Sequence, residues 1–450
     1  MNNKIKSDVL KIAIPSFIVA LFDQLFAVID TMLIGTISDK TVYVASLATI
    51  NVSTRIVLFI QALTQGTNIA ATTIYSRYMG KNDKEKMQST LLHTIFINVF
   101  VLTLPIIIIC LLFTKQIMTF IGTDKIVYDV GKGYYIAILI GFVFCSFNNI
   151  ISFLIRACGE SKKAMVCEVS SSVFNIVFDL LLINGFWIFP KLGVTGAGIA
   201  TGGSYVFLFI LYSLILLKSN SKLKIDFKQK FYFNKDMIKN ILKIGIPVSF
   251  ESLALKGSNI FYTKIISFAG IVVLAAQQIC ITIYGLFAEI GGAVAISVTP
   301  LVSESLGKKD KNIAKKYVKY GVFLAIKISL VASLIFILLN NPILNTFTKV
   351  VEVKEQVKMV LIFVLLSQFS QNIRDVYAAG LRGAGDTTYN AKISCIFDVI
   401  LKLTLSYFFV CILRLGLVSI WIIVFVTESI KILLYYSRLN SNKLKIIKLK

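Results

Sequence analysis

Twelve long apolar runs constrain this chain more than any other feature of its sequence. Each is roughly 20 residues long or longer, which is the length an α-helix needs to cross a bilayer. The chain is 56% hydrophobic and only 16% charged, whereas soluble domains are about 25% charged. We therefore predict an all-α integral membrane protein with twelve transmembrane helices.

Lysine and arginine are spread unevenly over the loops between these runs. If both termini are cytoplasmic, the inside loops and tails hold about 30 cations and the outside loops about 9. This asymmetry predicts a multi-pass protein of the cell inner (plasma) membrane. It also accounts for the net charge of +24, because cytoplasmic loops face anionic headgroups. The bilayer is the expected partner of these cations, and no nucleic-acid partner is required.

Three sequence patterns of the first half recur in the same order in the second half. This duplication divides the chain into an N-lobe of residues 1–220 with six runs and a C-lobe of residues 221–450 with six more. A basic cytoplasmic linker at about 218–243 joins them. Because six is even, both lobes enter the membrane in the same direction, and a pseudo-twofold axis along the membrane normal relates them. The paired patterns are LKIAIP with LKIGIP, MGKNDKEK with LGKKDKNI, and LIRACGESKKA with GLRGAGDTTYNA.

The first run, from Leu10 to Gly35, carries two acids, Asp23 and Asp30. They are seven residues apart and fall on nearly the same helix face. A carboxylate in the bilayer core is costly and marks a functional site by default; an acid at a wet helix end is the alternative. At the corresponding position the C-lobe has Tyr262, so the acid Asp30 belongs to one lobe only.

A proline opens the first run of each lobe, Pro15 in one and Pro247 in the other. At a helix start a proline is harmless. If the helix begins earlier, the proline lies inside it and can bend it. We predict a helix-bending role for both residues.

A second polar group lies in the fifth run, where Asn175 and Asp179 are four residues apart and share a helix face. Asp179 is expected to face the bundle interior, as Asp30 does. Two neighbouring carboxylates in a low dielectric cannot both stay ionised cheaply, so the pair can carry a proton. The same oxygens can instead hold a sodium ion. The residues leave this choice open.

These motifs, together with VIDTMLIG, LGVTGAGIAT and VLAAQQI, resemble those of the multidrug and toxic compound extrusion (MATE) family. The resemblance covers nearly the whole chain. It implies two six-helix bundles around a V-shaped central cavity. It also implies export of drug-like cations by alternating access, in antiport with protons or sodium ions.

Matched residue by residue, the family's first-run acid falls on Asp30. The coupling pocket of the DinF-like branch falls on Asn175, Asp179 and Thr201, although an asparagine of that pocket is replaced near Ser152. The resemblance therefore favours the DinF-like branch over the NorM-like branch, which places acids in the second lobe.

Three further acids are candidates for attracting a cationic substrate. Glu251 and Glu289 in the C-lobe have no obvious partner nearby in sequence, and Asp23 is a supporting residue. Two other acids are predicted to form neutralising pairs, Asp398 with Lys402 and Glu428 with Lys431.

The expected function is secondary active efflux of organic cations or amphipathic small molecules by a monomer. The alternative is a lipid-linked oligosaccharide flippase of a related fold, but its cationic cavity does not match the scattered cations of these runs. A passive channel is a second alternative, which would run downhill without an ion gradient. The sequence has no DDxxD or HExxH motif, so we expect no enzyme. We likewise expect no cofactor and no resident metal, the coupling ion being H⁺ or Na⁺.

Overall fold

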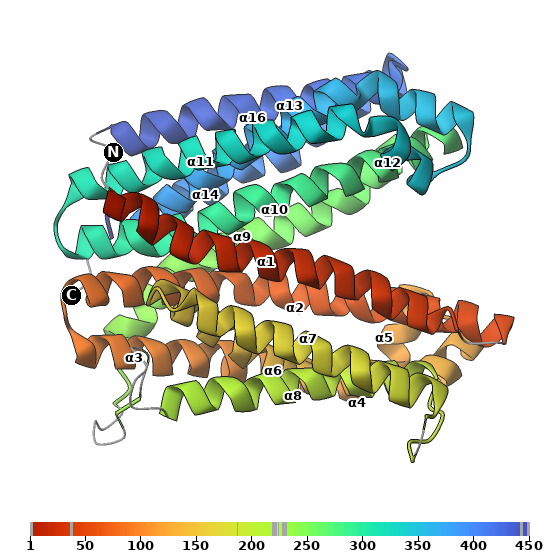
Figure 1. Cartoon of the computed structure of the whole chain (residues 1–450), viewed down its shortest axis with the longest axis horizontal. Coiled ribbons are helices and arrows are strands. Elements are labelled where there is room, and N and C mark those ends of the chain that lie inside the picture. The colour runs from red at the N-terminus through yellow and green to blue at the C-terminus, as the bar shows by residue number, and fades with distance from the viewer. Residues whose placement is uncertain are drawn as a thin grey trace. The chain divides into compact units, whose positions relative to one another are not determined.

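The computed structural model describes residues 3–36, 39–186, 188–217, 223, 225–226, 232–441 and 444–447. Within these residues all regular secondary structure is helical (Figure 1). The backbone packs as two compact units. The N-terminal unit contains residues 18–75 and 83–242, and the C-terminal unit contains residues 1–17, 76–82 and 243–450.

The helices that build the N-terminal unit run nearly the full length of the predicted spans. Span three is a composite helix, in which a π-helical segment ends just before Pro105, a residue that has no N–H to donate. Helices α6 and α8 pack closely, since a Cβ added at Gly141 would lie 2.4 Å from the Cα of Gly202. The elements that lie wholly or largely in this unit are α1 (Asn3–Ile34), α2 (Lys40–Gly80), α3 (Lys84–Ile95), η1 (Phe96–Thr103), α4 (Leu104–Leu112), α5 (Thr114–Ile121), α6 (Lys125–Ala157), α7 (Ser161–Asn184) and α8 (Val194–Leu217).

The C-terminal unit repeats this order of helices. Its core is built by α10, α13 and α16, which pack around the buried Trp421. The end of α2 belongs to this unit, because Arg77 donates hydrogen bonds to the carbonyls of Gly383 (2.8 Å) and Ile447 (3.1 Å). The elements that lie wholly or largely in this unit are α9 (Lys235–Ser267), α10 (Ile271–Gly307), α11 (Lys311–Leu338), α12 (Asn340–Phe347), α13 (Val351–Ala384), α14 (Thr387–Ser394), η2 (Cys395–Leu401), α15 (Lys402–Ser406), η3 (Tyr407–Ile412) and α16 (Gly416–Asn440).

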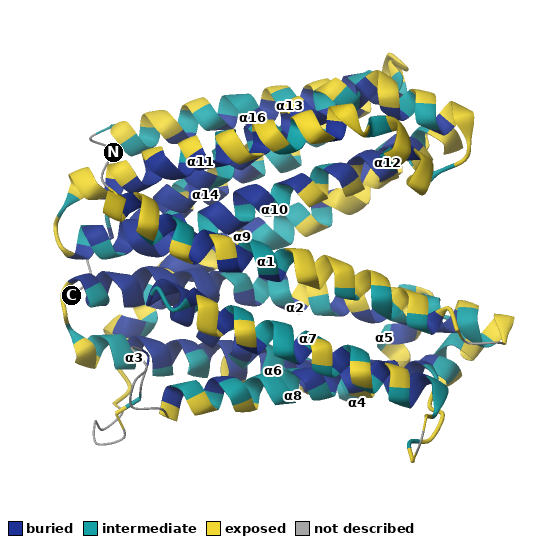
Figure 2. Cartoon of the chain, viewed as in Figure 1, coloured by how far each residue is buried: buried dark blue, intermediate teal, exposed yellow. Residues whose placement is uncertain are grey.

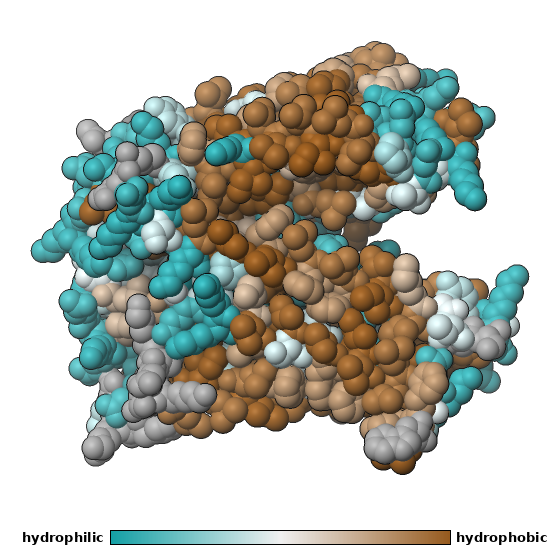
Figure 3. Space-filling model, viewed as in Figure 1, coloured by the Kyte–Doolittle hydropathy of each residue, from teal (hydrophilic) through white to brown (hydrophobic). Residues whose placement is uncertain are grey.

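The prediction of an all-helical membrane protein is confirmed. Ten described helices are long and apolar enough to span a bilayer. The two remaining predicted runs form α9 and α13, which are 33 and 34 residues long. Many large apolar side chains are exposed along the helices (Figure 2). On the face shown in Figure 3, apolar side chains cover the middle of each unit, while hydrophilic side chains gather toward the helix ends. This is the surface that lipid requires.

Pro15 and Pro247 both lie inside their helices. Helix α1 begins at Asn3 and α9 at Lys235, twelve residues before each proline. The helix-start alternative is therefore wrong for both, and each proline removes one backbone hydrogen bond from a helix interior. A role in helix bending stays a prediction.

Candidate functional site

Two carboxyl groups meet inside the N-terminal unit. Asp30 near the end of α1 and Asp179 in α7 lie within side-chain hydrogen-bonding reach of each other. Asp179 is only 1% exposed and Asp30 is half-buried. In each carboxyl, the Oδ1 atom is buried and has no hydrogen-bond partner among the described residues. The pair is thus buried and incompletely satisfied.

The neighbouring amide and hydroxyl groups come from α7 and α8. Asn175 lies one turn before Asp179 and is buried. Its Nδ2 donates to the Thr201 hydroxyl at 3.4 Å, and that hydroxyl donates to the carbonyl of Ala197 at 2.9 Å. The structure therefore brings together the four residues predicted for ion coupling. The first and last of them, Asp30 and Thr201, are 171 positions apart in the sequence.

Tyr134 in α6 also lies near this site, a neighbour that the sequence did not predict. It is 8% exposed and within electrostatic range of both Asp30 and Asp179. Nothing marked it among the other tyrosines of the apolar runs, because its partners are distant in sequence. Asp23 lies two turns before Asp30 and is exposed.

The acid pair has no cationic partner in the part of the chain that the structure describes. The ion pairs found there involve other acids. Burial and mutual repulsion both disfavour the state in which both carboxylates are ionised. The site can relieve that cost by holding a proton, or by taking up a cation between the carboxylates.

Ser152 belongs to a different cluster. Its hydroxyl donates to Glu168 at 2.6 Å, and it accepts a hydrogen bond from Arg156. Arg156 also forms an ion pair with Glu168 at 2.5 Å, and the Tyr212 hydroxyl donates to the same carboxylate at 2.8 Å. This position therefore supports a closed ion-paired network.

The charged residues of the C-terminal unit are paired instead. Lys431 is fully buried, and its Nζ lies 2.6 Å from Asp398 and 2.7 Å from Glu428. Arg374 pairs with Glu428 at 2.8 Å and with Asp375 at 2.6 Å. The predicted Glu428–Lys431 pair is present. A buried network of this kind is satisfied in itself and gives no obvious place for a mobile ion.

The other predicted pair is wrong, because Asp398 pairs with Lys431 rather than with Lys402. The ammonium group of Lys402 lies over the ring of Tyr262, 4.2 Å from its centroid. The π-helical segment η2 precedes Lys402, so the four-residue spacing of a regular α-helix does not apply there.

Of the two predicted C-lobe acids, Glu251 has partners and Glu289 has none described. Glu251 is 3% exposed and accepts hydrogen bonds from Asn390 (2.9 and 3.1 Å) and Ser394 (2.7 Å). Arg382 lies 3.5 Å from it. Glu289 is half-buried on α10. The partners of Glu251 come from about 130 to 145 residues later, which is why the sequence did not reveal them.

The repeated helical units and the buried acid site define a multi-pass membrane transporter. The sequence model of the MatE family matches residues 15–181 and 247–408, one segment in each sequence repeat. The chain belongs to this family, whose members are transporters and not enzymes.

Similar proteins cover nearly the whole chain. A probable multidrug resistance protein NorM of Thermotoga maritima is 23% identical over 428 residues, covering 93% of this chain and 89% of that protein. The uncharacterized transporter YisQ of Bacillus subtilis is 22% identical, covering 92% and 89%.

Solved structures share the fold. The outward-facing conformation of a multidrug resistance MATE family transporter of the MOP superfamily has a TM-score of 0.87 and 21% identity, covering 97% of this chain and 96% of that one. A crystal structure of MATE in the bent conformation has a TM-score of 0.85 at 21% identity, with 96% and 94% covered. The fold is therefore that of two bundles with twelve helices in all. Assignment to the DinF-like branch stays a prediction.

Proposed function

We propose that this chain, a multidrug efflux transporter of the MatE family, exports organic cations or amphipathic compounds in antiport with protons. The observation that supports proton coupling is the Asp30–Asp179 pair. Its two carboxyl groups lie in the protein interior without a cationic partner among the described residues. A group that must alternate between a charged and a neutral state needs such surroundings. A permanently paired acid would not change state.

The proposed cycle makes proton and substrate binding mutually exclusive. With the pair deprotonated, its negative charge favours a cationic substrate. Uptake of a proton from the outside removes that charge, weakens binding and releases the substrate outward. One charge moving through 100 mV supplies about 2.3 kcal/mol, which is enough to bias two conformations. Pro15, inside the same helix as Asp30, is a weak point at which α1 can bend.

Sodium is the alternative coupling ion. The Asp30 and Asp179 carboxylates, with the side-chain oxygens of Asn175 and Thr201, make an all-oxygen set of the kind that hard cations prefer. No group of three or more His, Cys, Asp or Glu residues suited to a metal ion occurs among the described residues. We propose that transport requires no cofactor besides the coupling ion.

The remaining features of the proposal concern topology and assembly. We propose that both termini are cytoplasmic, since the basic loops then lie on the inside of the cell inner (plasma) membrane. We also propose that the transporter acts as a monomer. Cysteine accessibility in spheroplasts at residues of the 79–86 and 306–313 loops would test the orientation.

Export of ethidium, measured as its uptake into everted vesicles whose cytoplasmic face points outward, tests the coupling. A pH gradient and a sodium gradient are imposed separately on vesicles carrying wild type, Asp30→Asn or Asp179→Asn. The control is Asp129→Asn, which removes an exposed acid of α6. Proton-driven efflux should be lost in both site variants and kept in the control. Efflux by Asp30→Asn equal to wild type, or efflux driven by sodium alone, would overturn the proposal.

A further inference from the structure

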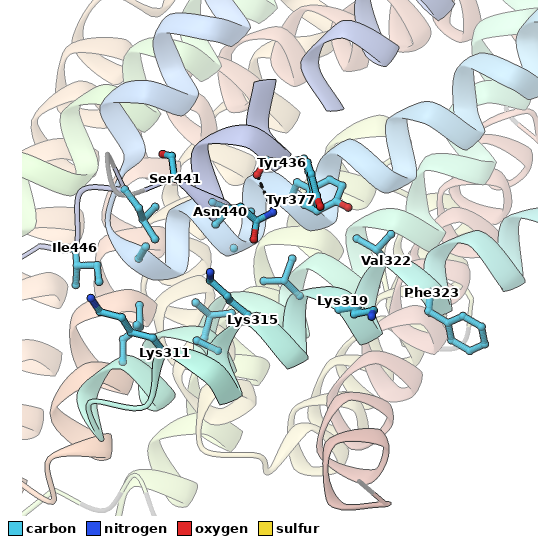
Figure 4. Close-up of a pocket in the computed structure, with 18 of the residues that line it drawn as sticks. Lys311, Lys315, Lys319, Val322, Phe323, Tyr377, Tyr436, Asn440, Ser441 and Ile446 are labelled. Carbon is cyan, nitrogen blue, oxygen red and sulfur yellow. Dashed lines mark hydrogen bonds between the residues drawn. The ribbon is translucent and has the colours of Figure 1, made fainter. Parts of the chain in front are cut away.

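A cavity of about 630 Å³ lies within the C-terminal unit, away from the acids discussed above. Residues of α10, α11, α13 and α16 line it, together with Leu444 and Ile446 after α16 (Figure 4). Its walls change character along α11. One end is cationic and the other is apolar.

Three lysines form the cationic end. Lys311, Lys315 and Lys319 follow one another at four-residue intervals on α11, so they lie on successive turns of one face. All three are exposed, and no ion pair with them is present among the described residues. No acidic residue occurs among the described residues that line the cavity. Like charges at this spacing destabilise a helix, so the stripe favours an anion beside it.

The apolar end continues the same helix face. Val322, Phe323 and Ile326 line the cavity beyond the last lysine, and Phe323 is 55% exposed. At 1.5 Å per residue, the distance along α11 from Lys311 to Ile326 is about 22 Å. The cavity therefore runs from the polar end of the helix into the apolar part of the span.

Two tyrosines lie opposite the lysines (Figure 4). The rings of Tyr377 in α13 and Tyr436 in α16 pack edge to face with their centroids 5.8 Å apart. Tyrosine is enriched at the boundary between membrane and water. Two tyrosines beside three lysines are the side chains expected where a helix bundle meets the headgroups.

We propose that this cavity binds an anionic glycerophospholipid, with its phosphate beside the lysine stripe and an acyl chain along Val322 and Ile326. A free phosphate would leave the apolar half of the cavity unused. A cationic substrate would be repelled by the three lysines. Basic pockets between membrane helices are suited to anionic lipid headgroups. The bound lipid would contact α11, α13 and α16 together and hold these helices against one another.

Native mass spectrometry of the full-length chain in detergent tests the site. Phosphatidylglycerol is added to wild type and to the Lys311→Gln/Lys315→Gln/Lys319→Gln variant. The control variant carries glutamine at three exposed lysines that do not line the cavity, Lys239, Lys316 and Lys358. Each lysine near a headgroup changes the affinity by about fivefold. The cavity variant should therefore bind phosphatidylglycerol about 100-fold more weakly, and the control should match wild type.

Competition experiments distinguish binding of a whole lipid from binding of its headgroup alone. Phosphatidylcholine, inorganic phosphate and glycerol phosphate should each fail to displace phosphatidylglycerol at concentrations at which a second anionic phospholipid displaces it. A Val322→Trp variant, which fills the apolar end, should weaken binding with the lysines intact. Equal binding by the cavity variant and the control, equal competition by phosphatidylcholine, or displacement by inorganic phosphate would each overturn the proposal.

Discussion

The two units of this chain differ in whether their clustered acidic residues have cationic partners. In the N-terminal unit, Asp30 and Asp179 are together without a cationic partner among the described residues. In the C-terminal unit, Glu428 and Asp398 are held by Lys431, and Arg374 adds a further contact. A pair of bare carboxyls can change its charge at modest cost, whereas an ion-paired carboxylate loses its partner's stabilisation when it is protonated. This difference underlies our proposal that coupling lies in the first unit, while the acids of the second unit support the structure.

The largest expected effect concerns pH and substrate affinity. If a proton and a cationic substrate compete for the acid pair, binding of tetraphenylphosphonium weakens as pH falls through the range in which the pair takes up its proton. One displaced proton corresponds to about a tenfold change in affinity per pH unit. Asp179→Asn should bind weakly at every pH. Calorimetry measures the affinity at each pH. If the affinity of Asp179→Asn changed with pH as that of wild type does, the contrast between the two units would be contradicted.

Lys431→Met tests the paired network. It leaves the half-buried Asp398 and the buried Glu428 without their shared cation, and breaking a buried pair costs about 3–5 kcal/mol. The melting temperature in detergent should fall strongly. Asp179→Asn, which removes a charge that has no counter-ion, should leave it unchanged or higher. Equal melting temperatures would contradict the contrast.

Glu251→Ala probes an acid that the structure places in a hydrogen-bonded setting. The change leaves the Asn390 amide without its acceptor and removes the bond from Ser394 to the carboxylate, and an unsatisfied buried group costs about 1–3 kcal/mol. The melting temperature should fall while ethidium efflux per folded molecule is kept. Glu289→Ala, at a site with no described ion pair, is the matched comparison and should melt as wild type does. Loss of efflux without loss of stability would make Glu251 a transport residue.

The smallest effect is expected at Tyr262, which replaces the acid in the second repeat. Its ring lies under the Lys402 ammonium group, and its hydroxyl is buried without a described partner. Tyr262→Leu should lower stability by about 1–2 kcal/mol through loss of the cation–π contact. Tyr262→Phe keeps the ring face and should melt at or above the wild-type temperature. A drop in Tyr262→Phe equal to that in Tyr262→Leu would show that the hydroxyl matters.

The fold was predictable because the length and composition of each apolar run are enough to predict a membrane-spanning helix. Run length, loop charge and the repeat all act locally or through simple symmetry, and each run forms a helix. The pairing of Asn175 with Asp179 was visible for the same reason, since four residues make one helical turn.

Contacts across helices were not predictable from the residues alone. The contact between Asp179 and Asp30 depends on how α1 packs beside α7, and the resemblance to a known family suggested it. Tyr134 and the partners of Glu251 were missed because they come from other helices. The pairing of Asp398 with Lys402 failed for a different reason, since the intervening backbone is partly π-helical.

Proton release on substrate binding tests the central claim most directly. Purified protein in weakly buffered detergent is mixed with tetraphenylphosphonium while a soluble pH dye records the protons set free. The account predicts about one proton released per substrate bound by wild type, and none by Asp30→Asn or Asp179→Asn. Substrate binding to wild type without proton release, or release that persists in both variants, would contradict it.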